Sequence, residues 1–282
     1  LITYLKTLAA SATSAVTDPR APRPQPGTIP LVDGGSLTGT IMNVSGFDAQ
    51  VRTPDGQIHL FRRESDAYRE VIIEPYRDWS SYNGSDTSNR HSSLNQINRD
   101  NVEQLTARWF YPIPDTQMIE GTPVVVAGVM YVTAANQVYA LDASTGREIW
   151  RYSQPRTPGL VGDPAIGLNR GVAIRNDRLF TVTDHAHVIA LDRFSGELIW
   201  DAEMADYRDH YGAIAAPLVV GDLVVAGISA GDTGLRGFLD AYHASSGERA
   251  WRFWTIPAPN EPGSETWGDP AVLRRGCGAT WL

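Results

Sequence analysis

The chain has 282 residues, of which 42% are hydrophobic and 20% charged, a composition typical of a folded globular protein. Its net charge of −8 and pI near 5.2 argue against nucleic-acid binding, because contacts to phosphates need clustered Lys and Arg. No run approaches the ~18 apolar residues of a membrane span. We therefore expect membrane association only through segments outside this chain. The single cysteine, Cys277, excludes an internal disulfide framework.

Three segments precede the main body of the chain. Residues 1–12 place apolar residues at helical spacing and predict a short amphipathic helix. Residues 13–30 include five prolines and predict an extended linker. Residues 31–73 hold short β-like runs around the turn at 53–56, which predicts a small β module. The chain does not begin with Met and shows no signal-peptide pattern, so we expect it to start inside a longer chain.

An internal repeat dominates the chain from Gly121 onward. Residues 140–150 reappear as 190–200 and again as 241–251, each beginning with Ala, holding a Gly and ending in Trp. The tryptophans, at 150, 200 and 251, are therefore 50 and 51 residues apart. Upstream of each copy lie two apolar runs joined by a small turn, so each unit supplies about four short strands.

Units of this kind cannot bury both faces alone, but they can do so when they stack around an axis. A terminal Trp can lie flat against a neighbouring unit where Ala and Gly leave room. The sequence therefore predicts an all-β fold, a β-propeller of four-stranded blades. Its domain would span residues 74–282 and follow the small β module.

The repeated pattern Ala-x-Asp-x-x-Thr-Gly-x-x-x-Trp resembles the tryptophan-docking repeat of the quinoprotein dehydrogenases. The resemblance runs from about Asp78 to Leu282. It implies an eight-bladed propeller that carries pyrroloquinoline quinone (PQQ) and a divalent cation on its axis. This chain would supply about half of the blades and be truncated at its C-terminal end.

Several short motifs extend the resemblance to the cofactor site. Glu120, before Gly-Thr-Pro, matches a family Glu that touches the cofactor, and Arg170 in Asn-Arg-Gly matches an Arg that pairs with a PQQ carboxylate. Thr183 aligns with a family hydroxyl ligand. Read from the residues alone, Glu120 fits an exposed turn carboxylate equally well, and Arg170 a solvated charge.

The segment 229–237 is the sharpest motif, similar to the family's Ser-Gly-Ala-Glu-x-Gly-Val-Arg-Gly. The resemblance places Ser229, Ala230 and Gly231 against PQQ and makes Asp232 the cation ligand. The resemblance implies Ca²⁺ as the usual cation. Asp232 replaces the usual Glu and is one methylene shorter, which alters the coordination or favours a larger cation such as a lanthanide. The alternative is an ordinary Gly-rich hairpin loop.

The segment 276–281 resembles the family's Gly-Gly-Gly-x-x-Trp, in which the Trp forms the floor under the PQQ ring. Trp281 is therefore the expected floor, and Thr280 a rim hydroxyl. Many relatives carry adjacent cysteines over PQQ at the position of Pro164-Ala165, so the cofactor must be capped differently here. His185 and His187 share a strand face but have no evident third metal ligand, and we expect them to be rim or surface residues.

The resemblance implies a periplasmic enzyme that oxidises an alcohol, sugar or aldehyde and passes electrons to a c-type cytochrome. It assigns the general base to blades beyond Leu282, so we expect no catalytic residue here and an inactive fragment. Residues 1–12 also resemble the closing helix of a cytochrome c domain, which would place haem c upstream. The rival interpretations are a non-catalytic propeller that acts as a protein-binding scaffold, and a sensor that binds PQQ without the base.

Overall fold

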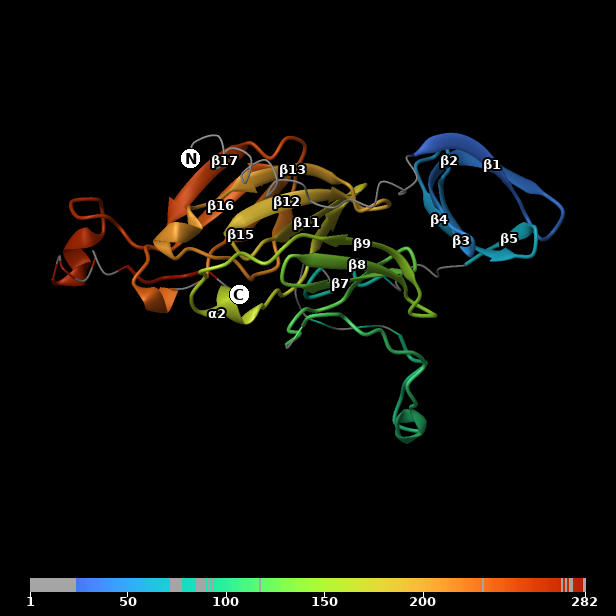
Figure 1. Ribbon diagram of the computed structural model, residues 1–282, viewed down its shortest axis with the longest axis horizontal. Helices are drawn as coiled ribbons and strands as arrows, with labels where there is room; N and C mark the ends of the chain where they lie inside the picture. Colours follow the sequence, from blue (N-terminus) through green and yellow to red (C-terminus); the bar gives the residue numbers. More distant parts are fainter. Residues whose placement is uncertain are drawn as a thin grey trace.

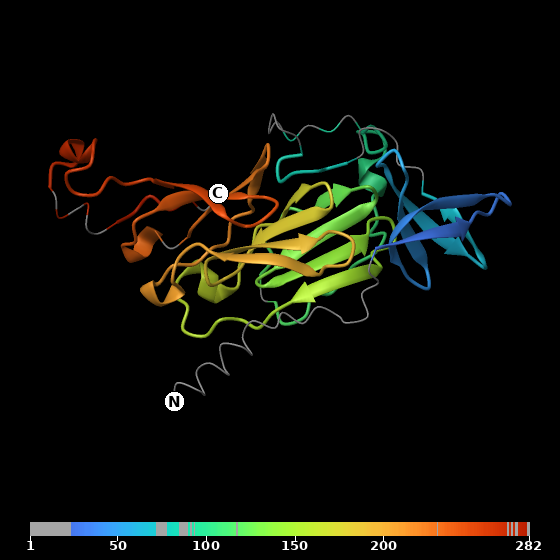
Figure 2. The same ribbon diagram turned by 90° about the horizontal axis from the view of Figure 1, so that it is seen from above.

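The computed structural model describes residues 24–71, 78–84, 90, 92, 94–116, 118–229, 231–269, 271, 273 and 276–280, without the side chain of Asp232. These residues form four antiparallel sheets (Figures 1 and 2). One sheet lies at an end of the molecule, beside the other three. Within the described ranges, no helix is long and apolar enough to cross a membrane.

The end sheet has five strands in chain order: β1 (Gln25–Pro30), β2 (Ser36–Val44), β3 (Asp48–Arg52), β4 (Ile58–Glu64) and β5 (Ala67–Glu70). It curls until its two edges meet, because Leu31 bridges Tyr68 and the Val32 amide donates to the Tyr68 carbonyl at 3.1 Å. The enclosed core includes Val51 and Phe61. We call residues 25–70 the β module.

The predicted linker through Pro30 is wrong for its last six residues, since Gln25–Pro30 is strand β1 and pairs with β2 along its whole length. Proline tolerates this position because β1 is an outer strand of the sheet, where a missing N–H donor breaks no bond of an inner ladder. Residues 1–12, and most of the linker, lie outside the described residues.

The repeat forms three four-stranded sheets, and the prediction of four-stranded propeller blades is confirmed. The first blade comprises β6 (Val124–Val126), β7 (Val129–Ala134), β8 (Gln137–Asp142) and β9 (Glu148–Ser153). The second comprises β10 (Ala173–Arg175), β11 (Arg178–Val182), β12 (His187–Asp192) and β13 (Leu198–Glu203). The third comprises β14 (Leu218–Val220), β15 (Leu223–Gly227), β16 (Phe238–His243) and β17 (Arg249–Trp254).

Short helical turns occupy the connections. They are η1 (Val102–Gln104), α2 (Asp163–Ile166), η2 (Tyr207–Asp209), η3 (Gly231–Thr233) and η4 (Ser264–Trp267). The blades pack face to face through apolar side chains of alternating strand positions. Tyr131 and Val138 of the first blade meet Leu179 and Ile189 of the second, and a second cluster joins the second blade to the third. Burial on both faces explains why a single blade could not fold alone.

Tryptophans connect successive blades through one repeated contact. The indole Nε1 of Trp150 donates to the Arg193 carbonyl of the next blade at 2.9 Å, and that of Trp200 to the Ala244 carbonyl at 3.1 Å. Trp109, which the repeat did not reveal, donates in the same way to the Ala143 carbonyl at 3.1 Å. Each indole lies on the turn glycine of the neighbouring blade, namely Gly196, Gly247 and Gly146 respectively.

The antiparallel strands of each blade place alternate turns at opposite strand ends, so each blade has two unlike sides on which its turns lie. At one edge, which we call the turn edge, the hairpin turn after the first strand lies beside the turn after the third: the Arg193 amide, for example, donates to the Asp177 carbonyl at 2.9 Å. The other edge, which we call the site edge, carries the turns between second and third strands and the connections between blades.

The β module binds the turn edge of the first two blades. Arg62 donates to both carboxylate oxygens of buried Asp142 at 2.6 Å, and Arg147 pairs with Asp48 in return. The side-chain amide of Asn43 donates to the Phe194 carbonyl of the second blade at 2.9 Å. The β module is therefore joined to the propeller on the side opposite the site edge.

Candidate functional site

The site edge has an inner rim made by the segments that enter successive blades. The Thr122 amide donates to the Arg170 carbonyl at 3.1 Å, and the Arg170 amide donates to the Ile214 carbonyl at 2.8 Å. These bonds join the entries of all three blades. Gly171 lies between them, where an added Cβ would lie 3.3 Å from the Thr122 carbonyl oxygen.

Glu120 and Arg170, 50 residues apart in sequence, form an ion pair on this rim. The Arg170 Nη2 atom lies 3.0 Å from Glu120 Oε2, and the side chains are 18% and 35% exposed, respectively. Buried Asn169 fixes the approach of Arg170: its side-chain amide donates to the Val182 carbonyl at 3.0 Å, and its oxygen accepts from the Gly171 amide at 3.0 Å. The Asn-Arg-Gly motif thus holds the guanidinium in one place.

The two segments that the motifs singled out, 229–237 and 276–280, lie side by side. The Cys277 amide donates to the Leu235 carbonyl at 2.6 Å, and the Gly237 amide donates to the Cys277 carbonyl at 2.9 Å. A side chain at Gly237 would collide with the Gly278 carbonyl, so glycine is needed for this close approach. The residues that these two bonds join are 40 and 42 positions apart in sequence, and only folding brings them together.

Ser229 is the most informative residue of the predicted set. It is 1% exposed, its amide donates to the Gly212 carbonyl at 2.8 Å, and its buried hydroxyl has no hydrogen-bond partner among the described residues. A buried polar group without a partner costs about 1–3 kcal/mol. A hydroxyl retained at that cost beside the rim indicates a ligand that would supply the partner.

Thr133 is a second buried hydroxyl of this kind, which the sequence did not single out. It is 1% exposed, and its Oγ1 atom has no partner within the described part of the chain. The same atom lies 3.1 Å from the position of a Cβ added at Gly121, directly after Glu120. Threonine inside a strand carries no signal by itself, because β-branched residues are common there.

Two other predicted hydroxyls already bond within the protein. Thr183 Oγ1 accepts from the His187 amide at 3.3 Å, inside the turn before β12. Thr280 Oγ1 donates its only proton to the Phe238 carbonyl at 2.7 Å and accepts from the Ile228 amide at 3.2 Å. Their roles toward a ligand stay predictions.

Of the remaining predicted residues, only Gly231 has contacts that the structure describes. Gly231 opens η3, packed against Ala279: an added Cβ would lie 2.8 Å from the Ala279 Cβ. Ala230 and Trp281 lie outside the described residues, as does the side chain of Asp232. The described groups therefore fit an anionic ligand with hydroxyl contacts, whereas the cation site and the ring floor stay predictions.

The rings of His185 and His187 contact each other at the site edge in a tilted arrangement, with centroids 4.3 Å apart and an interplanar angle of 52°. His187 Nδ1 lies 2.7 Å from Asp201 Oδ1, and His185 Nδ1 lies 3.2 Å from Asp184 Oδ1. Among the described residues, no group of three or more His, Cys, Asp or Glu is arranged to hold a metal ion.

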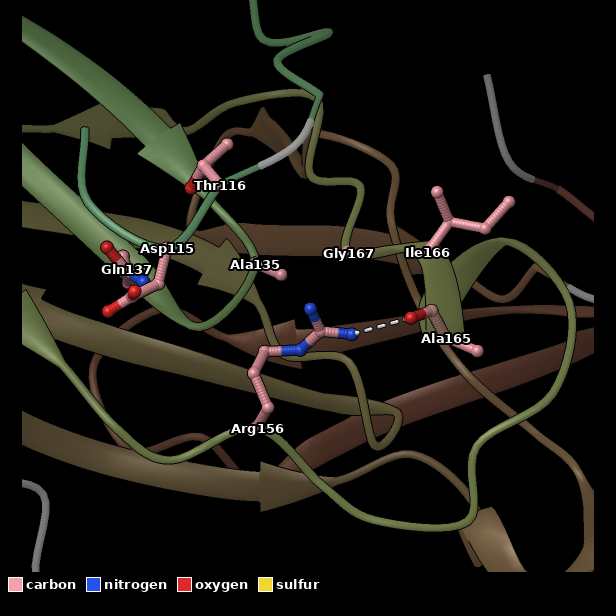
Figure 3. Close-up of a pocket in the computed structure, with 8 residues that line it drawn as sticks. All are labelled: Asp115, Thr116, Ala135, Gln137, Arg156, Ala165, Ile166 and Gly167. Atoms are coloured by element: carbon pink, nitrogen blue, oxygen red, sulfur yellow. Dashed lines mark hydrogen bonds between the residues drawn. The ribbon is translucent and has the colours of Figure 1, made fainter. Parts of the chain in front are cut away.

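Asp184 beside them is buried, with its carboxylate fully shielded from solvent. Burial alone raises its pKa, but hydrogen bonds from His185 and Arg156 outweigh that effect and lower the pKa to about 2. Arg156 lines a neighbouring pocket of about 270 Å³ together with Gln137 and Ala165 (Figure 3). No motif predicted this charged cluster.

Comparison with known proteins gives a consistent result. The PQQ family model, described as the glucose/ethanol/alcohol dehydrogenase β-propeller domain, matches residues 79–281. A quinone-dependent alcohol dehydrogenase subunit of Gluconacetobacter polyoxogenes is 34% identical over 84% of this chain and 32% of that protein. Quinohemoprotein alcohol dehydrogenase ADH-IIG of Pseudomonas putida is 36% identical over 72% of this chain and 30% of that protein.

Solved structures agree with these matches. The ADHIIG structure from Pseudomonas putida HK5 has a TM-score of 0.65 and 33% identity, covering 72% of this chain and 32% of that one. A europium-containing methanol dehydrogenase has a TM-score of 0.64 and 31% identity, covering 72% and 39%. The chain spans about a third of the length of the curated relatives that it matches. On this evidence, the chain belongs to the PQQ family of glucose/ethanol/alcohol dehydrogenase β-propellers.

Proposed function

We propose that this chain is the cofactor-holding part of a PQQ-dependent dehydrogenase that oxidises an alcohol, sugar or aldehyde. The observation that carries the proposal is the buried hydroxyl of Ser229, which has no hydrogen-bond partner in the described part of the chain and lies beside the rim that bears Arg170. The names of the relatives, which are quinone-dependent alcohol dehydrogenases and quinohemoproteins, support it.

In this proposal, Arg170 supplies positive charge for a carboxylate of PQQ, with Glu120 fixing the guanidinium on the rim. Ser229 donates its hydroxyl proton to the cofactor, and the next two residues, Ala230 and Gly231, contact the cofactor from the same segment. Trp281 forms the flat floor. When bound, PQQ supplies the two-electron acceptor for oxidation of the alcohol.

The cation is proposed to be Ca²⁺ or a lanthanide, held by Asp232. Hard cations of either kind require oxygen ligands, and a carboxylate at this position provides one. The europium-containing methanol dehydrogenase among the similar structures supports the lanthanide alternative. A cation titration of the protein in the presence of PQQ, comparing Ca²⁺ with La³⁺, would separate the two.

Binding can be tested directly by titrating PQQ into the protein as its gene encodes it and following tryptophan fluorescence. Ser229→Ala should weaken PQQ binding by about tenfold, because one hydrogen bond to an ionised ligand is lost. Ser245→Ala is the matched control: Ser245 is exposed at the turn edge of the same blade, and its loss should change nothing. Equal affinities for both variants would refute the site.

The proposal extends to partners and location. The electrons would pass to a c-type cytochrome, in keeping with the quinohemoprotein relatives, and the protein would work in the periplasm. The family resemblance assigns the general base to a later blade, so residues 1–282 alone should bind PQQ without turnover. Alcohol-dependent dye reduction by that segment with PQQ and Ca²⁺ would contradict this assignment. A non-catalytic scaffold would instead fail to bind PQQ.

A further inference from the structure

The connection between the first and second blades, residues 154–172, carries Arg170 at its end and the helical turn α2 (Asp163–Ile166) in its middle. It is long and has no strand of its own, so something other than a sheet must fix its shape. Asn136 fixes its first residues: the Asn136 side chain donates to the Pro155 carbonyl at 3.0 Å, and the Gln154 amide donates to the Asn136 carbonyl at 3.0 Å.

Buried Asp184 of the second blade fixes the next part of this connection. Arg156 Nε donates to Asp184 Oδ2 at 2.7 Å, and the Thr157 hydroxyl donates to Asp184 Oδ1 at 2.8 Å. The Asp184 carboxylate is fully shielded from solvent. A shielded carboxylate with several donors is a strong anchor, because removing one donor leaves part of the buried charge without compensation.

Arg156 extends from this anchor to α2. Its Nη2 atom donates to the Pro164 carbonyl at 2.7 Å. The same atom donates to the Ala165 carbonyl at 3.2 Å, as Figure 3 shows. Gly167, which ends the turn at φ +93°, leaves room for the guanidinium, because an added Cβ would collide with Arg156 Nη1. One side chain thus joins the Asp184 anchor to two consecutive carbonyls of α2.

The turn held by Arg156 in turn contacts the site. The Pro164 ring packs on Gly212, where an added Cβ would lie 2.8 Å from Pro164 Cβ and 3.1 Å from the Asp184 carbonyl oxygen. Gly212 accepts the amide hydrogen bond of Ser229 at 2.8 Å. A continuous chain of contacts therefore runs from Asp184 through Arg156, Pro164 and Gly212 to Ser229.

We propose that Arg156 is a positioning residue that clamps α2 against Gly212 and so fixes the wall of the cofactor site at Ser229. The clamp itself depends only on the described contacts, whereas its effect on cofactor retention rests on the proposed function. Arginine suits this role because its planar fork places donors on separate nitrogens, Nε for the carboxylate and Nη2 for the backbone carbonyls, whereas lysine carries all its donors on one nitrogen.

The test compares Arg156→Ala and Arg156→Lys with the wild type, each made in the protein as its gene encodes it. Arg208→Ala is the matched control, since Arg208 also pairs with an Asp but is 71% exposed. Hydrogen exchange, measured without cofactor, follows the amides of Ala165 and Gly167, which donate to Gly162 and Pro164 carbonyls within the turn.

Exchange at these amides should accelerate about tenfold to a hundredfold in Arg156→Ala and in Arg156→Lys, because both lose donors to the α2 carbonyls. Lys keeps the charge opposite Asp184, so Arg156→Lys should retain the melting temperature better than Arg156→Ala. PQQ dissociation, measured by stopped-flow fluorescence, should accelerate by a similar factor in both. Arg208→Ala should match the wild type in every measurement.

The outcomes separate the two proposals. Unchanged exchange at Ala165 and Gly167 in both Arg156 variants would overturn the clamp, whatever PQQ does. Faster exchange with unchanged PQQ dissociation would overturn the link between clamp and site. A wild-type protein that binds no PQQ would overturn the proposed function while leaving the exchange test of the clamp valid.

Discussion

The contact between Trp150 and the next blade allows a sharp test of how the blades associate. Trp150 is 7% exposed, and its Cε3 atom lies 2.6 Å from where a Cβ at Gly196 would be. Gly196 also has φ +76°, a conformation that costs an L-residue about 1–2 kcal/mol. Forcing a methyl group against a buried indole adds about 1–3 kcal/mol. Gly196→Ala should therefore lower the free energy of unfolding by about 2–5 kcal/mol.

Gly221→Ala is the matched control, since Gly221 sits in a turn at the same edge with φ +59° and no atom within 4 Å of an added Cβ. Gly221→Ala should lower the free energy of unfolding only by the cost of placing an L-residue at positive φ, about 1–2 kcal/mol. Urea unfolding followed by circular dichroism measures both. In a Trp150→Ala background, Gly196→Ala should cost no more than Gly221→Ala. Equal losses for the two glycine variants in the wild-type background would show that the indole does not dictate glycine at 196.

Two further predictions concern buried carboxylates. The pKa of Asp184 falls from its ordinary 3.8 to about 2, so its charge adds about 2 kcal/mol of stability, present above pH 4 and lost as the pH falls through 2. Asp184→Asn should lose this stabilisation at pH 7. The fall of the urea unfolding midpoint between pH 4 and pH 2 should therefore be smaller in Asp184→Asn than in the wild type. An equal fall in both proteins would contradict the assignment. Arg62→Ala, which removes both bonds to Asp142, should cost about 1–3 kcal/mol in urea unfolding. The exposed pair of Arg69 and Glu64 should contribute about 0–1 kcal/mol, so an equal loss in Arg69→Ala would refute the docking role of Arg62.

The small β module illustrates a boundary that local sequence rules misplace. Proline content predicts a linker through Pro30, but Pro26 and Pro30 pair with Thr40 and Ser36 in the ladder of β1 and β2. Composition cannot tell a free proline-rich segment from an outer strand, because the difference lies in whether a partner strand is available. That partner, β2, lies within the predicted β module, but the local sequence does not show that it pairs with the proline-rich segment.

The repeat by itself determined the blade, its four strands and its docking tryptophan, because these depend on turns and spacings within about 50 residues. The repeat did not predict Trp109 as a docking tryptophan, because Trp109 makes the same contact without the repeated residues around it. The motifs also named Glu120, Arg170 and Ser229 before any of their contacts were known.

Only the tertiary structure decided which of these residues meet. It pairs Glu120 with Arg170 and sets the segment at 276–280 against 229–237. It also buries the Ser229 hydroxyl where no described residue offers it a hydrogen bond. The Arg156 clamp on Asp184 has no sequence signature. A guanidinium can reach any carboxylate that folding brings near it, so its partner is fixed by how the blades pack and not by the residues beside it in the chain.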